Sequence, residues 1–192
     1  MFFEGRMMRP FLQVTEEKLF AKPFPNRYNE VQIPGREWGW RDKWDVRFMK
    51  MAYLISEWTS CYMEGRSIGA VIVKDKRIMT TGYNGAPAGL KTCRERGECM
   101  RRKLNIASGT RAEVCYAIHA EQNAILQAAK LGISIDGATL YCTHQPCSVC
   151  AKMIVNTGIR RVVYQQGYPD SFSIEIFKEA GVQLERFEEP LD

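Results

Sequence analysis

Residues 42–58 alternate between apolar and polar positions with the period of a helix. Apolar side chains recur at steps of three and four residues: Trp44, Phe48, Ala52 and Ile55. This spacing places one apolar stripe along an α-helix. Asp42 precedes the stripe and is suited to cap the helix N-terminus.

The pattern changes to that of strands after residue 67. The run 68–73 is apolar and rich in β-branched side chains, and residues 77–81 have strand-forming composition. The polar residues 74–76 between them favour a turn, so the two runs predict a β-hairpin. Residues 82–89 contain several turn-forming residues and predict a loop.

From residue 112 onward, predicted helices and strands alternate. The segments are a helix over 112–131 capped by Gly132, a strand over 138–142, a helix from Pro146 to Thr157 ended by Gly158, a strand over 161–164, a helix capped by Ser171 or Ser173 and ending near Gly181, and an edge strand over 182–187. This order is typical of α/β domains. We therefore predict a three-layer α/β/α fold around a mainly five-stranded mixed sheet.

Domain organisation follows from the same patterns. Residues 1–41 contain four prolines without sustained periodicity and predict an irregular N-terminal extension, whereas residues 42–192 form the α/β domain. At 45% hydrophobic and 26% charged residues, the composition is that of a globular protein. There is no apolar stretch of membrane-spanning length and no signal-peptide pattern, so no membrane is expected and the cytoplasm is the expected location.

Positive charge is concentrated between residues 91 and 111. The formal net charge is +5, and this segment holds seven cations against Glu95 and Glu98: Lys91, Arg94, Arg96, Arg101, Arg102, Lys103 and Arg111. Such a cluster is typical of a site for nucleotide phosphates or nucleic acid, and equally of a solvated loop. Residues 91–112 are therefore predicted to be a charged, irregular insertion.

The seven cysteines favour metal binding or catalysis, because an odd number without a signal peptide argues against a disulfide framework. His119 is followed by Cys147 and Cys150, and the two cysteines share one face at the start of a predicted helix. The positive end of that helix dipole favours thiolates. Three such ligands leave a fourth tetrahedral position open, which is the arrangement of a catalytic zinc site.

Glu121 lies two residues after the predicted ligand His119. Zinc lowers the pKa of bound water, and a neighbouring carboxylate can carry the protons that deamination requires. His119-Ala-Glu121 followed by Pro146-Cys147-Ser-Val-Cys150 matches the H-x-E…P-C-x-x-C signature of zinc deaminases. His144 lies nearby, but we interpret it as a loop residue and not as a ligand.

At these residues the sequence resembles the deoxycytidylate deaminase family. The resemblance runs from about residue 43 to 187 and includes the segments 68–73, 82–89, 119–125 and 151–159. The Gly-Tyr-Asn-Gly-x-Pro-x-Gly pattern of residues 82–89 is its most discriminating part. The resemblance implies a cytidine deaminase-like fold and hydrolysis of dCMP to dUMP and ammonia, which feeds dTTP synthesis.

The resemblance also implies substrate contacts. Asn84 would bond the sugar hydroxyl, and the Ala120 backbone amide would bond the base carbonyl. Arg66 is the candidate phosphate ligand, although the stretch before Ile68 is about two residues longer than the family pattern, and Tyr168 resembles an aromatic residue near the nucleotide. An Asn-Gly turn, an exposed charge and core packing are the alternative interpretations of Asn84, Arg66 and Tyr168.

Further properties are implied by the same resemblance. Many bacterial members carry a second, structural zinc, for which the candidate ligands here are Cys61, Cys93, Cys99 and Cys115. The alternative is four free, buried cysteines. Members are commonly homo-oligomers, often hexamers, and many are activated by dCTP and inhibited by dTTP.

Two other functions remain open at the sequence level. The first is the same chemistry on a tRNA adenosine, a nucleoside or a pterin, for which the basic segment 91–111 would suit RNA. The second is a zinc-stabilised nucleic-acid-binding module without turnover. Residues 82–89 argue against the first, and Glu121 argues against the second because a structural zinc needs no acid beside it.

Overall fold

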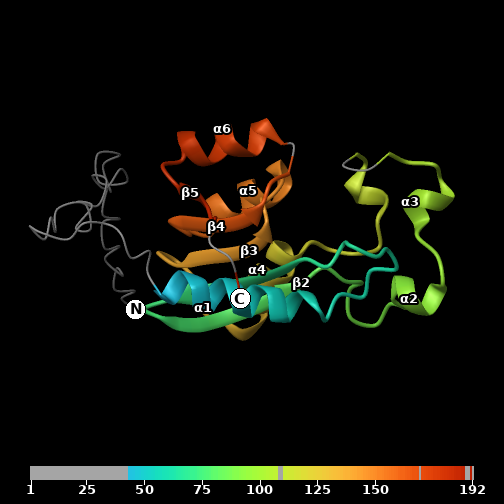
Figure 1. Ribbon diagram of the computed structural model, residues 1–192, viewed down its shortest axis with the longest axis horizontal. Helices are drawn as coiled ribbons and strands as arrows, with labels where there is room; N and C mark the ends of the chain where they lie inside the picture. The colour runs from blue at the N-terminus through green and yellow to red at the C-terminus, as the bar shows by residue number, and fades with distance from the viewer. Residues whose placement is uncertain (1–42, 108–109, 169, 189–190, 192) are drawn as a thin grey trace, which may run out of the picture. The chain divides into compact units, whose positions relative to one another are not determined.

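The computed structural model describes residues 43–107, 110–168, 170–188 and 191 (Figure 1). The helices are α1 (Lys43–Ser56), α2 (Cys93–Arg96), α3 (Met100–Lys103), α4 (Ala120–Leu131), α5 (Ser148–Asn156) and α6 (Ser171–Glu179). The strands are β1 (Gly69–Lys74), β2 (Arg77–Tyr83), β3 (Thr139–His144), β4 (Arg161–Gln166) and β5 (Gln183–Arg186). The predicted extension, residues 1–41, and the predicted cap Asp42 lie outside the described residues.

The five strands form one mixed sheet in the order β2-β1-β3-β4-β5. Strand β1 pairs antiparallel with β2 and β3, whereas β3, β4 and β5 are parallel. The predicted hairpin, the predicted edge strand and the mixed five-stranded sheet are confirmed.

Helices cover both faces of the sheet, as alternation along the strands requires. On one face, Val71 and Val73 of β1 pack with Phe48, Met49 and Ala52 of α1. On the other face, the neighbouring side chains Ala70 and Ile72 join a core cluster with residues of α4, α5 and α6, including Ala124, Ile154 and Phe177. The predicted three-layer α/β/α architecture is therefore present.

Gly82 lets α4 lie directly on β2. A Cβ atom at position 82 would lie 2.2 Å from the carbonyl oxygen of Ala120 and 2.4 Å from the amide nitrogen of Ala124. Both neighbours are backbone atoms, so no side chain could move aside. The Asn123 side chain also donates a hydrogen bond to the Tyr83 carbonyl at 3.0 Å. The first turn of α4, which carries the predicted site residues, is thus held against the sheet.

Helix α4 begins at Ala120, so the predicted start at residue 112 is wrong. A short 3-10 helix occupies Ala112–Val114, and Ile118 forms an isolated antiparallel bridge with Gly85. His119 then has extended backbone angles, φ −74° and ψ 157°, and serves as the N-cap. Helix propensity predicted the earlier start, and the tertiary bridge overrides it. The predicted Gly132 cap is confirmed by its left-handed conformation at φ 66°.

Two other predicted helix starts are shifted. Helix α5 begins at Ser148 with Cys147 as its N-cap, two residues after the predicted first position at Pro146. Asp170 caps α6 in place of the predicted Ser171 or Ser173, because its carboxylate accepts a hydrogen bond from the Ser173 amide at 3.0 Å. An aspartate directly before a Ser-x-Ser sequence satisfies the same orphan amides.

The insertion 91–112, predicted to be irregular, contains the one-turn helices α2 and α3. A reciprocal capping box starts α2: the Thr92 side chain accepts a hydrogen bond from the Glu95 amide, and the Glu95 carboxylate accepts one from the Thr92 amide. Gly97 ends the turn in the left-handed region at φ 66°. None of the helices in the described part of the chain is both long and apolar enough to cross a bilayer.

Candidate active site

The N-terminal ends of α4 and α5 meet on one face of the sheet and bring together the three predicted zinc ligands. His119 is the N-cap of α4, Cys147 is the N-cap of α5, and Cys150 lies in the first turn of α5. The first-turn amides of α4 and α5 have no acceptor within their own helix and supply positive potential there. The site is therefore built from element ends that the packed core holds in place.

The three ligand atoms have the spacing of a tetrahedral metal site. Nδ1 of His119 lies 3.5 Å from Sγ of Cys147 and 3.4 Å from Sγ of Cys150, and all three atoms lie within 4.8 Å of one another. Ligands bonded to zinc at about 2.0–2.3 Å are about 3.5 Å apart in a tetrahedron. One histidine nitrogen and two cysteine sulfurs are ligands that suit zinc. Within the described part of the chain, these three residues form the one group of potential metal ligands this close together.

The electrostatics of the three groups favour a thiolate. A hydrogen bond from Cys150, and a further one from His119, lower the pKa of Cys147 to about 4. The hydrogen bond with Cys147 in turn raises the pKa of His119. The site therefore stabilises a thiolate at Cys147, whereas the hydrogen bond with Cys147 raises the pKa of Cys150.

Glu121 is buried beside these ligands and is only 4% exposed. Burial raises the pKa of its carboxyl group, and the nearby His119 opposes that shift. No salt bridge to Glu121 forms among the described residues. A buried carboxyl group whose pKa is raised toward neutrality is suited to accept and release protons.

The predicted base contact, Ala120, directly follows the ligand His119, and the predicted sugar contact, Asn84, precedes Gly85, which pairs with Ile118 beside that ligand. Ala120 is the first residue of α4 and is completely buried. The Asn84 side chain accepts a hydrogen bond from the Ile68 amide at 2.9 Å and donates one to the Arg66 carbonyl at 2.7 Å. Asn84 therefore holds the loop before β1, and its carboxamide retains one further donor and acceptor site.

The predicted phosphate ligand Arg66 and the predicted nucleotide-side aromatic residue Tyr168 lie near each other. Burial raises the pKa of the half-buried Tyr168, whereas the positive charges of Arg101 and Arg66 act in the opposite direction. Arg66 itself is exposed. The structure thus brings a third residue, Arg101 of α3, to this place.

The four cysteines predicted for a second zinc also gather near one another. Burial raises the pKa of the Cys93 thiol, and Cys115, Cys61 and Cys99 raise it further by their charge. They do not form a group of ligand atoms as close as the first site, and all seven cysteines of the chain are free. Cys142 is fully buried in β3, as expected for core packing.

Two positioning residues were missed at the sequence level. Asp170 accepts hydrogen bonds from the Ser148 amide at 2.7 Å and from the Ser173 amide, and so joins the starts of α5 and α6. Gln122 accepts a hydrogen bond from the His119 amide at 2.9 Å. The signal for Gln122 was its place three residues after the cap, as in a capping box.

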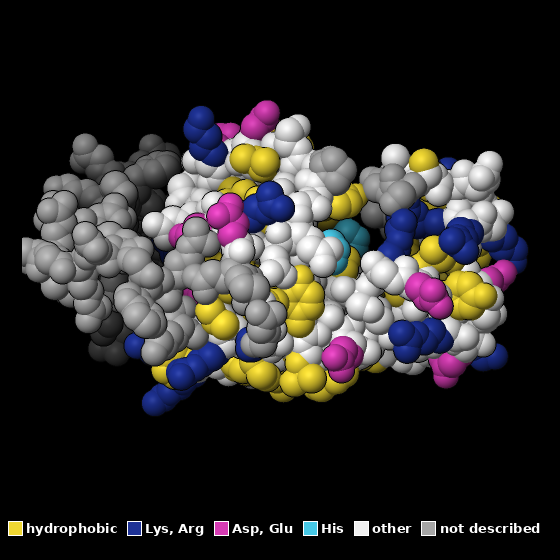
Figure 2. All heavy atoms as spheres, in the orientation of Figure 1, with side chains coloured by type: hydrophobic (Ala, Val, Ile, Leu, Met, Phe, Trp, Pro, Cys, Tyr) yellow, Lys and Arg dark blue, Asp and Glu magenta, His cyan; other side chains and the backbone are white. Residues whose placement is uncertain are grey.

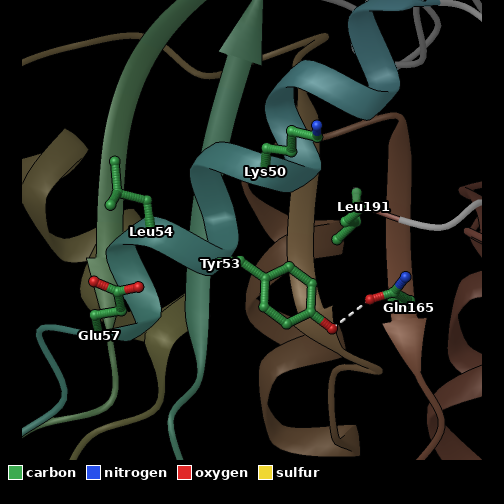
Figure 3. Close-up of a pocket in the computed structure, with 6 residues that line it drawn as sticks. All are labelled: Lys50, Tyr53, Leu54, Glu57, Gln165 and Leu191. Carbon is green, nitrogen blue, oxygen red and sulfur yellow. Dashed lines mark hydrogen bonds between the residues drawn. The ribbon is translucent and has the colours of Figure 1, made fainter.

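A separate pocket lies beside α1, on the face of the sheet away from the zinc ligands (Figure 3). Tyr53 lies at its centre and donates a hydrogen bond to Gln165. Its lining residues are Lys50, Tyr53, Leu54, Glu57, Gln165 and Leu191. None of the predicted site residues lines this pocket.

The fold and the His-Cys-Cys site define a zinc deaminase-like domain. A sequence profile described as the cytidine and deoxycytidylate deaminase zinc-binding region matches residues 42–166, and the chain belongs to that family.

Individual relatives are deoxycytidylate deaminases. The enzyme of Schizosaccharomyces pombe is 38% identical over 151 residues, which cover 78% of this chain and 46% of that protein. The chain thus spans about half the length of this relative. The enzyme of Mycobacterium phage D29 is 41% identical over 65% of this chain and 95% of its own. The dCMP deaminase of cyanophage S-TIM5, solved in complex with dCMP and dUMP, has a TM-score of 0.62 at 30% identity and covers 77% of this chain and 99% of its own.

Proposed function

We propose that the protein is a zinc-dependent deaminase that hydrolyses dCMP to dUMP and ammonia. The observation that carries this proposal is the placement of the buried Glu121 carboxyl group beside three zinc-ligand atoms at tetrahedral spacing. Relatives that match most of their own length to this chain, such as the phage enzyme, are deoxycytidylate deaminases and support the choice of substrate.

In this proposal His119, Cys147 and Cys150 hold the zinc ion. Zinc in a three-ligand protein site supplies a hydroxide nucleophile at neutral pH. Glu121 accepts the proton that the attacking water loses and delivers it to N3 of the cytosine ring. It then carries the second proton to the departing amino group, so that dCMP and water become dUMP and ammonia.

The remaining parts of the site position the nucleotide. The Ala120 amide, at the N-terminus of α4, donates to the base carbonyl. Asn84 uses its remaining hydrogen-bonding capacity for the sugar hydroxyl, Arg66 lies at the phosphate, and Tyr168 lies beside the nucleotide. Their support is the arrangement around the ligands and the proximity of Arg66 to Tyr168.

We propose a second, structural zinc ion held by Cys61, Cys93, Cys99 and Cys115. The mutual effect of these thiols on Cys93 supports it. Exposed apolar side chains, such as Trp58 at 58% and Leu131 at 62%, support a homo-oligomer, for which a hexamer is our proposal. Regulation by dCTP and dTTP rests on the family resemblance. The free thiols suit a reducing compartment, so we propose the cytoplasm.

The test is ammonia release from the zinc-loaded chain offered dCMP, CMP, deoxycytidine and dCTP in parallel. A tRNA substrate and a pterin serve as the alternative substrates, and dCTP is also added to the dCMP reaction as an activator. We expect turnover of dCMP above all other compounds.

The control variant is Glu121→Ala, which keeps all three metal ligands. Equal zinc content and lost turnover in this variant would assign the chemistry to Glu121. Turnover of the tRNA or the pterin in preference to dCMP would overturn the substrate. Salt-sensitive nucleic-acid binding without turnover of any compound would overturn the enzyme assignment.

A further inference from the structure

The described residues of the positive segment, which carry α2 and α3, form one side of a hollow in which a histidine side chain lies. Figure 2 shows a histidine side chain deep in a hollow of the surface, with Lys and Arg side chains on the side formed by the segment that carries α2 and α3. The chain has two histidines, His119 and His144, and both lie at this end of the sheet. Cations thus face the place where a substrate would enter.

Most cations of this segment are engaged within the protein. Arg94 donates to the Cys61 carbonyl at 3.2 Å, and the Arg96 guanidinium lies 4.2 Å from the centre of the Tyr116 ring. Two others form ion pairs in the same segment: Lys103 with Glu98 at 3.1 Å, and Arg111 with Glu113 at 3.3 Å. The segment is therefore mostly a self-contained, charged surface structure.

Arg101 differs from these neighbours. Its side chain is half-buried, and Nη2 donates to the Ala107 carbonyl. Its Nε is buried and has no hydrogen-bond partner, and no carboxylate pairs with its charge among the described residues. A buried donor without an acceptor destabilises a protein, and a guanidinium without a counter-charge does so further. Such a group indicates an anion that binds there.

The location of Arg101 indicates which anion binds there. Its charge acts on both His119 in the zinc site and Tyr168, and the charge of Arg66 acts on the same Tyr168 hydroxyl. Two guanidinium groups beside a tyrosine, next to a site for a pyrimidine ring, suit a phosphate group. Guanidinium binds phosphate oxygens through parallel N–H bonds.

We propose that Arg101 binds the 5′-phosphate of the nucleotide, so that helix α3 completes the substrate site and determines its preference for phosphorylated pyrimidines. This inference rests on the proposed deaminase function. Arg101 acts with Arg66 and Tyr168, and the phosphate provides the acceptor and the negative charge that Arg101 lacks within the protein.

The experiment compares kcat/KM for dCMP and for deoxycytidine, which lacks the phosphate, in the full zinc-loaded chain. The variants are Arg101→Ala, Arg101→Lys and the control Arg102→Ala, which removes an exposed charge from the adjacent position of α3. Zinc content and the thermal unfolding midpoint are measured for each protein. These two measurements show whether a variant has lost its fold or its metal.

Loss of a hydrogen-bonded charge contact corresponds to about a 10- to 100-fold change. We expect Arg101→Ala to lower kcat/KM for dCMP by about that factor through KM, with deoxycytidine unchanged. Arg101→Lys should recover part of the loss, because it keeps the charge without the planar fork. Arg102→Ala should leave both substrates unchanged.

Two results would overturn the inference in distinguishable ways. An equal loss on both substrates, or no loss on either, in an active protein would assign Arg101 a purely structural role at Ala107 while leaving the deaminase function intact. Absence of dCMP turnover in the unsubstituted, zinc-loaded chain would instead remove the proposed function, and the inference with it.

Discussion

Two carboxyl groups, the half-buried Asp45 and the buried Glu121, lie on opposite faces of the same sheet and differ in their surroundings. Asp45 of α1 accepts hydrogen bonds from Nη2 of Arg161 at 2.6 Å, Nη1 of Arg161 at 2.9 Å and the Tyr141 hydroxyl at 2.5 Å. Glu121 of α4 lies beside the zinc ligands and has no salt bridge within the described residues. The first carboxylate is fully paired, and the second is not.

Their pKa values change in opposite directions. Burial raises the pKa of Asp45, but the hydrogen bonds and charge of Arg161 outweigh it, so that the pKa lies below 3.8. For Glu121, burial prevails and the pKa is raised. A paired carboxylate stabilises the fold, whereas a buried carboxyl group left without a cation is kept for proton transfer. The comparison therefore separates stability from chemistry across one sheet.

The largest expected effect is on turnover, from Glu121→Gln. We expect the rate of dCMP deamination to fall by about 10²–10⁴-fold, because the amide cannot carry protons. The free energy of unfolding should not decrease, since a neutral isostere replaces a buried acid. Initial rates and urea unfolding at equal zinc content measure both. A substantial residual rate would remove Glu121 from the chemistry.

The second prediction concerns a substitution that lowers stability and leaves turnover unchanged. Asp45→Asn should lower the free energy of unfolding by about 2 kcal/mol, because Arg161 loses its less exposed carboxylate partner in a half-buried position. The initial rate of dCMP deamination should be unchanged, since Asp45 lies on the face away from the zinc ligands. Urea unfolding at neutral pH measures the first quantity. Unchanged stability would show that the ion pair contributes nothing.

The third prediction concerns acid unfolding. Because the pKa of Asp45 is lower in the folded chain than in the unfolded chain, its contribution to stability is complete above the ordinary pKa of 3.8. The contribution is lost as the pH falls below that value. The urea midpoints of the unsubstituted chain and of Asp45→Asn should therefore converge between about pH 4 and pH 2. A constant difference over that range would contradict the assignment.

The smallest expected effect comes from the outer partner of the same arginine. Glu185 of β5 bonds Nη2 of Arg161 at 2.6 Å, but its side chain is 47% exposed. Solvent screens such a pair, so Glu185→Gln should lower the free energy of unfolding by only about 0.5 kcal/mol. Differential urea unfolding at low and high salt measures this. An effect as large as that of Asp45→Asn would show that the network acts as one unit.

The sheet and the zinc ligands could be predicted because their signals are local. Short apolar runs between turn residues identified β1 to β4, alternation identified β5, and His119, Cys147 and Cys150 belong to a short motif that lies at helix ends. The start of α4 was predicted wrongly because the bridge between Ile118 and Gly85 joins residues far apart in the sequence. No local pattern reports such a contact.

The role of individual cations in the charged insertion could not be predicted from the sequence either. The charges of residues 91–111 were visible in the sequence, but seven cations looked alike there. Only the fold shows that Arg94, Arg96, Lys103 and Arg111 are engaged by their neighbours whereas Arg101 retains an unused donor near the site. The pairing of Asp45 with Arg161, 116 positions apart, was equally invisible.

The most direct test of the proposed function follows dCMP during addition of zinc to the metal-free chain, with Cys150→Ser as the matched variant. Absorbance reports the conversion to dUMP, and ammonia is measured in the same samples. The chain should produce one ammonia for each dUMP at a rate that rises with bound zinc, and Cys150→Ser should remain inactive. Unchanged dCMP in the zinc-loaded chain, or full turnover in the metal-free chain, would contradict the account.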